Sequence, residues 1–138
     1  MSEPTVADSR RWTRLYAPGD PRDIAIEHED ALSMFKAAVA RAAERPAIHY
    51  FDGTLSFGEL DALSDALAVA LMEHGLSQGD RVALFLQNMP QFLIGELAAW
   101  KAGAIAMPIN PMNRERELGT LLADAQPKAI ISQERYFH

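Results

Sequence analysis

The sequence predicts an α/β fold in which parallel strands are flanked by helices and preceded by a short β-hairpin. Short apolar stretches alternate with helical patterns between residues 81 and 131, in the order strand–helix–strand–helix–strand. The first of these stretches, Arg81–Leu86, has almost no polar alternation, which is typical of a strand buried on both faces. Short connections in this order imply parallel pairing with right-handed crossovers. The dipeptide Asp52-Gly53, between two strand-like stretches, predicts the hairpin.

The first part of the chain is expected to form an irregular arm followed by a helix. Residues 1–30 are rich in Pro, Asp, Glu and Arg, and their apolar side chains are few: Trp12, Leu15, Tyr16, Ile24 and Ile26. We interpret them as anchors of an arm laid over a larger surface. A helical pattern then runs from Leu32 to Ala42 and ends before Pro46. The hairpin strands are expected over Ala47–Phe51 and from Thr54.

The helix after the hairpin has complete start and stop signals. Ser56 and Glu59 have the spacing of a capping box, in which each side chain accepts from the other residue's backbone N–H. Gly75 ends the helix because glycine tolerates positive φ. We expect a buried stripe of leucines and a solvent-facing set of acids: Leu60, Leu63, Leu67 and Leu71, and Glu59, Asp61 and Asp65.

Two further helices and strands follow the strand at Arg81–Leu86. The predicted elements are a helix over about 90–102, a buried strand over Ala104–Ile109, a helix ending near Pro127 and a strand over Ala129–Ile131. Asn88 and Asn113 are expected to cap the two helices, and Gly103 to end the first of them. Three parallel strands leave at least one sheet edge with unpaired backbone groups.

Composition limits the function. The chain has 138 residues, 49% of them hydrophobic, which fits one globular domain. It has no cysteine, so disulfides, thiolate metal sites and cysteine nucleophiles are excluded. A formal charge of −6 argues against a general nucleic-acid binder. We find no apolar leader in Met1–Arg14 and no apolar stretch approaching the roughly 20 residues of a membrane span, so a cytoplasmic protein is expected.

Several polar residues are candidates for a functional site, and each has a structural interpretation. His28 lies in the acidic run Glu27–Asp30, which we interpret as a solvated loop, and His49 lies mid-strand. The hydroxyl of Ser56 is used by the cap. Asp61 and Asp65 lie one helical turn apart and are interpreted as a solvent face, as is the alternating run Arg114–Glu117. Three methionines are interpreted as core filler: Met89, Met107 and Met112.

No glycine-rich phosphate cradle is present, because the eight glycines never have the required spacing. The histidines are not paired as metal ligands would be. From the residues alone, the chain is an α/β unit without a complete active site.

Two segments nevertheless resemble a known family. Residues 55–60 (LSFGEL) resemble the first core motif, L-[TS]-Y-x-E-L, of the AMP-forming adenylating superfamily, which comprises acyl-CoA synthetases, peptide-synthetase adenylation domains and luciferases. Residues 100–110 (WKAGAIAMPIN) resemble its second core motif, L-K-A-G-x-x-x-V-P-[IL]-[DN]. Residues 79–83 (GDRVA) and Asn88 stand where the family has G-D-R-V-A and Asn. The resemblance covers about residues 32–131.

Within this superfamily the chain is most similar to long-chain fatty acid–CoA ligases. The similarity includes the arm from Trp12 to Pro21, residues 34–48, Asn110-Pro111 and Glu117-Leu118. Peptide-synthetase adenylation domains more often have Asp where Asn110 stands. Aryl and medium-chain ligases and a peptide-synthetase adenylation domain remain alternatives.

The resemblance implies an α/β subdomain of the acyl-CoA synthetase fold and a two-step ligation. A fatty acid carboxylate attacks the α-phosphate of ATP, pyrophosphate leaves, and CoA then displaces AMP from the acyl-adenylate, with Mg²⁺ assisting the first step. The motifs that perform this chemistry in the family have no counterpart here. We therefore carry no catalytic, cofactor-binding or metal-binding residue onto this chain, and Lys101 is not the family's catalytic lysine.

The organisation expected is an irregular arm over residues 1–30 and the first part of an AMP-binding domain over 31–138, truncated before the phosphate loop. By itself such a fragment of a ligase is expected to be inactive and to bind none of ATP, CoA or Mg²⁺. The parent enzyme is expected in the cytoplasm, with a peripheral membrane position and a homodimer as open options. The rival interpretation is a standalone flavodoxin-like module that binds a partner or dimerises without catalysis.

Overall fold

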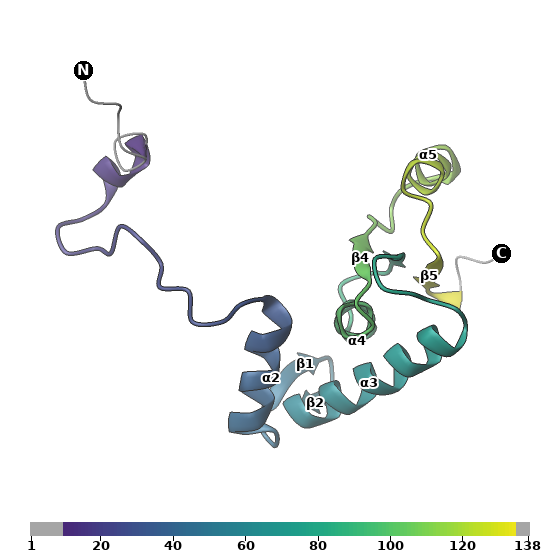
Figure 1. The fold of residues 1–138 in the computed structure, drawn as a ribbon, viewed down its shortest axis with the longest axis horizontal. Coiled ribbons are helices and arrows are strands. Elements are labelled where there is room, and N and C mark those ends of the chain that lie inside the picture. Colours follow the sequence, from purple (N-terminus) through teal and green to yellow (C-terminus); the bar gives the residue numbers. More distant parts are fainter. Residues whose placement is uncertain (1–9, 135–138) are drawn as a thin grey trace.

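The computed structural model describes residues 10–134, which form two small sheets with helices around them (Figure 1). The first nine residues of the predicted arm and the last four residues of the chain lie outside this range. In chain order the elements are η1 (Arg11–Leu15), α2 (Ala31–Ala42), β1 (Pro46–Tyr50), β2 (Gly53–Ser56), α3 (Phe57–Glu73), β3 (Arg81–Phe85), α4 (Pro90–Lys101), β4 (Ile105–Pro108), α5 (Glu115–Ala125) and β5 (Ala129–Ser132).

The larger sheet is parallel, as the sequence predicts, with the strand order β4-β3-β5. Val82 of the central strand pairs with Ala106 on one side and with Ala129 on the other. Val82, Ala83 and Leu84 have no exposed surface. The continuous apolar stretch in β3 therefore reflects a strand with a neighbour on each side and helices over both faces.

Helices cover the two faces of this sheet. On one face, α3 and α4 pack over Val82 and Leu84, with Leu71, Phe92 and Ala99 among the contacting side chains. On the opposite face, α5 contributes Leu118 and Leu122 and packs over Ala83, Phe85 and Ile109. The core is thus divided by β3 into two apolar layers, the expected arrangement for a sheet with strand–helix–strand connections.

The second strand of this sheet differs from the prediction. A buried strand was predicted over Ala104–Ile109, but β4 covers Ile105–Pro108 and is half-exposed, with 50% of Ile105 accessible. Within the described residues β4 pairs with β3 alone, and so does β5. An edge strand lacks the neighbour that would cover its outer side, and the sequence of one strand does not reveal its place in the order.

The hairpin turn lies one residue earlier than predicted. Tyr50 pairs with Gly53, so the two-residue loop is Phe51-Asp52 and not Asp52-Gly53. Phe51 has a φ of 51° and its side chain is 92% exposed. A bulky residue at positive φ is uncommon, so this turn is a strained point of the hairpin.

The buried stripe of α3 also differs from the predicted leucines. Its fully buried residues are Leu60, Ser64 and Ala68, spaced by four, whereas Leu63 is 45% exposed. Small side chains at 64 and 68 let α4 pack closely along α3. The Ser64 hydroxyl donates to the Leu60 carbonyl at 2.7 Å, so its burial leaves no polar group unpaired.

The two predicted asparagine caps are wrong. The N-cap residues of α4 and α5 are Met89 and Arg114, one position after Asn88 and Asn113. In α4 a proline at the first helical position, Pro90, supplies the start signal, because it needs no hydrogen bond there.

The described part of the arm stands away from the sheets (Figure 1). It contains the short 3-10 helix η1, which was not predicted, and is otherwise irregular up to Asp30. Its apolar side chains are exposed, with Leu15, Ile24 and Ile26 each at 88% or more. Among the residues described, no helix is long and apolar enough to cross a membrane.

Candidate functional site

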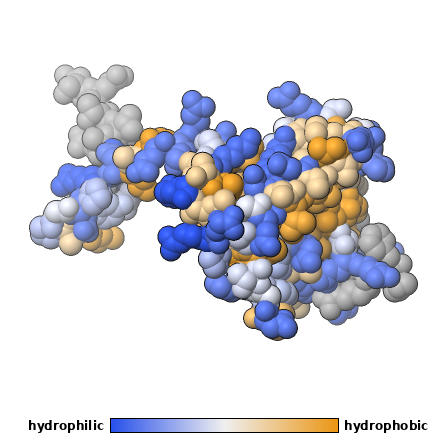
Figure 2. Space-filling model, turned by 90° about the horizontal axis from the view of Figure 1, so that it is seen from below, coloured by the Kyte–Doolittle hydropathy of each residue, from blue (hydrophilic) through white to orange (hydrophobic). Residues whose placement is uncertain are grey.

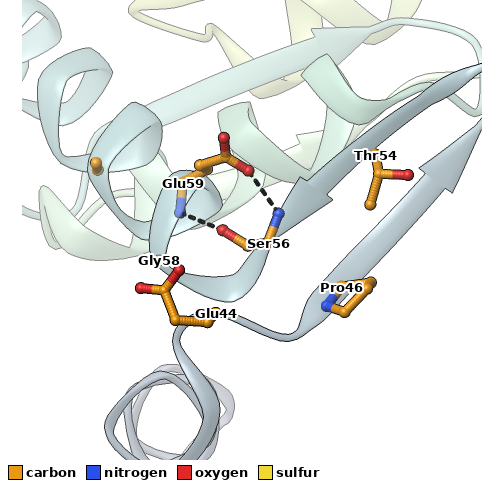
Figure 3. Close-up of a pocket in the computed structure, with 7 residues that line it drawn as sticks. Glu44, Pro46, Thr54, Ser56, Gly58 and Glu59 are labelled. Atoms are coloured by element: carbon orange, nitrogen blue, oxygen red, sulfur yellow. Dashed lines mark hydrogen bonds between the residues drawn. The ribbon is translucent and has the colours of Figure 1, made fainter.

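The first motif forms the N-terminus of α3. The Ser56 hydroxyl accepts from the Glu59 N–H at 3.1 Å, and the Glu59 carboxylate accepts from the Ser56 N–H at 2.8 Å, which confirms the predicted capping box (Figure 3). The hydrogen bond from the Ser56 backbone lowers the pKa of the Glu59 carboxyl below its ordinary value. Ser56 therefore serves as a helix cap, as expected, and not as a nucleophile.

The same motif joins α3 to the end of α2. The N–H groups of Phe57 and Gly58 donate to the carbonyls of Arg45 and Ala43, at 3.0 and 2.8 Å. A Cβ at position 58 would lie 3.3 Å from the Ala43 carbonyl oxygen, so the glycine allows this close approach. The first N–H groups of α3, which have no acceptor within their own helix, thus donate to carbonyls at the end of α2.

A cavity of about 540 Å³ lies beside this junction, and Figure 3 shows the side chains around it. Its lining residues are Glu44, Pro46, Thr54, Ser56, Gly58, Glu59 and Ala62. Two carboxylates and no basic residue line this cavity, so it disfavours a phosphate.

Lys101, in the second motif, is buried and forms a partly exposed ion cluster with the helix that follows the first motif. Its Nζ lies 2.6 Å from Asp61 Oδ1, 2.7 Å from Asp65 Oδ1 and 2.8 Å from the Asp61 carbonyl. The Lys101 side chain is only 6% exposed, against 29% for Asp61 and 63% for Asp65. It also lies 5.8 Å from the ring centre of Phe35, so α2, α3 and α4 meet there.

The interpretation as a solvent face holds for Asp65, which is 63% exposed, but it is wrong for Asp61, which is 29% exposed, and the basic partner of both residues was not foreseen. The two carboxylates are spaced by one turn and bind one ammonium group between them. Sequence inspection missed the partner because it lies 40 residues away from Asp61. The sequence did contain a signal of this pairing, because Lys101 ends a helix that is otherwise almost entirely apolar, and a buried lysine is nearly always paired.

The turn after Lys101 binds the Gly79-Asp80 segment. Gly103 has a φ of 70°, and its carbonyl accepts from the Gly79 N–H at 2.9 Å. The Ile105 N–H in turn donates to the Asp80 carbonyl at 2.8 Å. A Cβ at Gly103 would lie 3.2 Å from the Gln78 side chain. The prediction that Gly103 ends the helix is thus confirmed.

The carboxyl ends of the parallel strands form the edge at which open α/β sheets usually bind ligands. Asn110 lies there after β4, and its side chain accepts from the Met112 N–H at 3.0 Å, which makes it a turn residue. A second cavity, of about 430 Å³, lies at the ends of β3 and β5. It is lined by Leu86, Met89, Gln91, Ile131, Ser132, Gln133 and Glu134.

The other residues weighed in the sequence have structural roles. His49 Nδ1 lies 3.1 Å from the Thr54 hydroxyl on the facing strand. The acidic run before α2 contains that helix's cap, because Asp30 accepts from the Ser33 N–H at 2.6 Å; this was missed. Met107 packs against the core, as predicted. Met112 is 81% exposed, so the prediction that it fills the core is wrong.

Neither of the two cavities has the groups that bind the phosphates of ATP. The cavity at the strand ends offers amide and hydroxyl groups and one carboxylate, without a lysine or arginine to pair with phosphate. Between residues 10 and 134, no group of three or more His, Cys, Asp or Glu side chains could hold a metal ion. We derive no chemical step from these residues.

Comparison with known proteins identifies the family. The profile of a family described as AMP-binding enzyme matches residues 35–137, about three quarters of the chain. The chain belongs to this family. The second motif contacts the helix that follows the first motif through the Lys101 cluster, and it contacts the Gly79-Asp80 segment through the Gly103 turn, so the resemblance corresponds to one packed unit.

The curated relatives are much longer proteins. The chain is 34% identical, over 96% of its length, to the long-chain-fatty-acid–CoA ligase of Bacillus subtilis (strain 168), and it covers 24% of that protein. It is 41% identical to the olefin beta-lactone synthetase of Xanthomonas campestris pv. campestris, covering 91% of this chain and 22% of the relative. The chain thus spans about a quarter of the length of these relatives.

Solved structures show the same fold. The N-terminal subdomain of Klebsiella oxytoca NpsA, in complex with anthranilyl-AMSN, aligns with a TM-score of 0.71 and 30% identity, over 75% of this chain and 27% of that one. The anthranilate CoA ligase AuaEII aligns with a TM-score of 0.76 over 82% of this chain and 22% of that one. At 19% identity, that second likeness shows the fold alone. The predicted α/β subdomain of an adenylate-forming enzyme is confirmed.

Proposed function

We propose that this chain forms the first αβ subdomain of an ATP-dependent, AMP-forming fatty acid–CoA ligase. The observation that best supports this proposal is the match of nearly the whole chain to a long-chain-fatty-acid–CoA ligase, through segments that the fold packs together. The standalone binding module is less favoured, because it gives no reason for these segments to occur together in this order.

In the proposed enzyme a carboxylate oxygen of the fatty acid attacks the α-phosphorus of ATP, and the bond to the β-phosphate oxygen breaks to release pyrophosphate. The CoA thiolate then attacks the acyl carbon of the adenylate, and AMP leaves with the bonding electrons. We propose that ATP, CoA and Mg²⁺ are bound by residues outside the described range. The role of this chain is to hold the strand ends at Asn88, Asn110 and Ser132 in fixed positions.

The organisation proposed for the parent protein follows the sequence. Residues 1–30 form an arm, and residues 31–138 form the first part of the AMP-binding domain, before its phosphate loop. We propose a cytoplasmic enzyme with a peripheral position at the membrane. A homodimer is a further proposal, tested by light scattering.

The test is substrate-dependent ATP–pyrophosphate exchange by the native polypeptide that contains this chain, captured through an antibody against residues 56–74. Exchange that depends on palmitate, followed by a palmitoyl thioester on addition of CoA, is the expected result. Preference for octanoate or benzoate would assign a medium-chain or aryl ligase, and preference for an amino acid an adenylation domain. Absence of exchange with every carboxylic acid would refute a ligase.

A further inference from the structure

The far end of the arm has a defined local structure, which we call the hook (residues 10–23). An ion pair between Arg10 and Asp23 joins its two ends. Asp20 accepts from the Ala17 N–H at 2.9 Å, and the Thr13 hydroxyl donates to the Arg10 carbonyl at 2.9 Å. These contacts close residues 10–23 into a loop that contains the 3-10 helix η1.

Two columns of side chains run along η1. A 3-10 helix has three residues per turn, so side chains three apart lie in line. Trp12 and Leu15 form an apolar column, 55% and 88% exposed, and Tyr16 follows at 43%. Arg11 and Arg14, both exposed, form a basic column on the neighbouring side. The hook thus presents aromatic, aliphatic and guanidinium groups together to its surroundings.

The charge of the hook is opposite to that of the rest of the chain. The hook has four arginines against two aspartates, a net charge of +2. The whole chain has 13 basic and 19 acidic side chains, so the remainder has 9 and 17, a net charge of −8. By charge, an anionic surface attracts the hook and repels the rest of this chain.

The position of the hook suits a flat partner. It lies at the opposite end of the molecule from α5 and β5, joined to α2 by an irregular stretch (Figure 1). Figure 2 shows this end standing off the remainder, with hydrophobic and hydrophilic residues side by side. Within the described residues the hook therefore stands clear of the sheets and α-helices (Figure 1).

We propose that the hook is a membrane-surface contact, in which Arg11 and Arg14 bind the headgroups of anionic phospholipids while Trp12 and Leu15 enter the interface. Trp and Tyr favour this interface because they combine an apolar ring with a polar group. Arginines near an anionic leaflet add electrostatic attraction. The proposal rests on the proposed function to the extent that a long-chain fatty acid is a lipid-phase substrate, which such a contact brings within reach.

The test measures binding of the 138-residue chain to vesicles of 30% phosphatidylglycerol in phosphatidylcholine, by co-sedimentation and by tryptophan fluorescence. We expect binding that weakens with salt, and a blue shift that the Trp12→Phe variant loses; this variant identifies the signal because Trp100 also fluoresces. Vesicles of phosphatidylcholine alone should bind far more weakly. Each arginine near an anionic surface raises the affinity about fivefold. Removing both arginines with Arg11→Glu and Arg14→Glu should therefore weaken vesicle binding at least about 20-fold.

A matched control makes the same change of charge elsewhere. Arg114 and Arg116 are both exposed on or beside α5, so Arg114→Glu with Arg116→Glu should leave vesicle binding within about twofold if the hook is the contact. Equal loss in both double variants, or no binding by the unmodified chain, would overturn the proposal. So would a Trp12 shift that follows protein concentration without vesicles, which would assign the hook to a second copy. The assay contains no ATP or fatty acid, so its failure leaves the ligase proposal standing.

Discussion

Replacing Lys101 with methionine tests whether the ion cluster stabilises the junction of the second motif with α3. The substitution keeps the aliphatic stem and removes the ammonium group, which contacts Asp61 twice and Asp65 once. The Asp61 carboxylate, 29% exposed, loses its partner in a partly buried site. Breaking a buried pair costs about 3–5 kcal/mol, and we discount this to about 2–3 kcal/mol because Asp61 keeps some water.

The two aspartates should contribute unequally. Asp65 is 63% exposed, so Asp65→Asn should cost under about 1 kcal/mol. Asp61→Asn should cost about 2 kcal/mol, because it weakens a charge-assisted hydrogen bond to a side chain that is 6% exposed. In a double-mutant cycle, Lys101→Met and Asp61→Asn should therefore show a coupling energy of at least about 1 kcal/mol.

The assay is urea and thermal unfolding of the chain followed by far-UV circular dichroism. A loss of about 2–3 kcal/mol lowers Tm by roughly 8–12 °C in a domain of this size. Lys128→Met, at an exposed position before β5, is the matched control and should change Tm by less than about 2 °C. If Lys101→Met and Lys128→Met are equally stable, or if the cycle is additive, the reasoning about the cluster is refuted.

Three further changes test the packing and capping. Gly103→Ala should lower the melting temperature more than Gly75→Ala. Both glycines have a positive φ, which costs alanine about 1–2 kcal/mol, but only at Gly103 would the new Cβ meet a side chain within 4 Å. Equal melting temperatures would contradict this. Gly95→Ala should lower the free energy of unfolding by about 1–3 kcal/mol, because the new Cβ would lie 3.0 Å from a core leucine. The control is Gly119→Ala, where the new Cβ meets no atom within 4 Å, so the same urea titration should show a neutral or stabilising effect. Because the pKa of Glu59 is lowered in the folded state, its contribution to stability is present above the ordinary value of 4.5 and is lost on further acidification. Glu59→Gln should therefore flatten the fall of Tm below pH 4.5, and an unchanged slope would count against the cap.

Local features of the fold could be predicted from the sequence because their causes are local. The capping box of Ser56 and Glu59 involves residues three apart, and Gly75 and Gly103 end helices through their own φ angles. The burial of β3 was visible in its continuous apolar stretch. Each of these depends on a few neighbouring residues, so pattern and propensity decide them.

The features that were missed depend on parts of the chain that are distant in sequence. The Lys101–Asp61 contact joins two helices 40 residues apart. The exposure of Ile105 follows from the strand order, which no single strand encodes. The burial of Ser64 follows from the close packing of α4 on α3, where a small side chain fits and a leucine would not. The family resemblance marked the segments involved without showing that they touch.

The central claim, that this chain is one subdomain of a larger AMP-forming ligase, is tested most directly by the intact mass of the native protein. An immunoblot of the source cell, with an antibody against residues 56–74, gives this mass. The account predicts a species several times heavier than the 15.2 kDa of this chain, since the chain covers 24% of the Bacillus subtilis ligase. A species at 15.2 kDa alone would contradict it and would favour a standalone binding module.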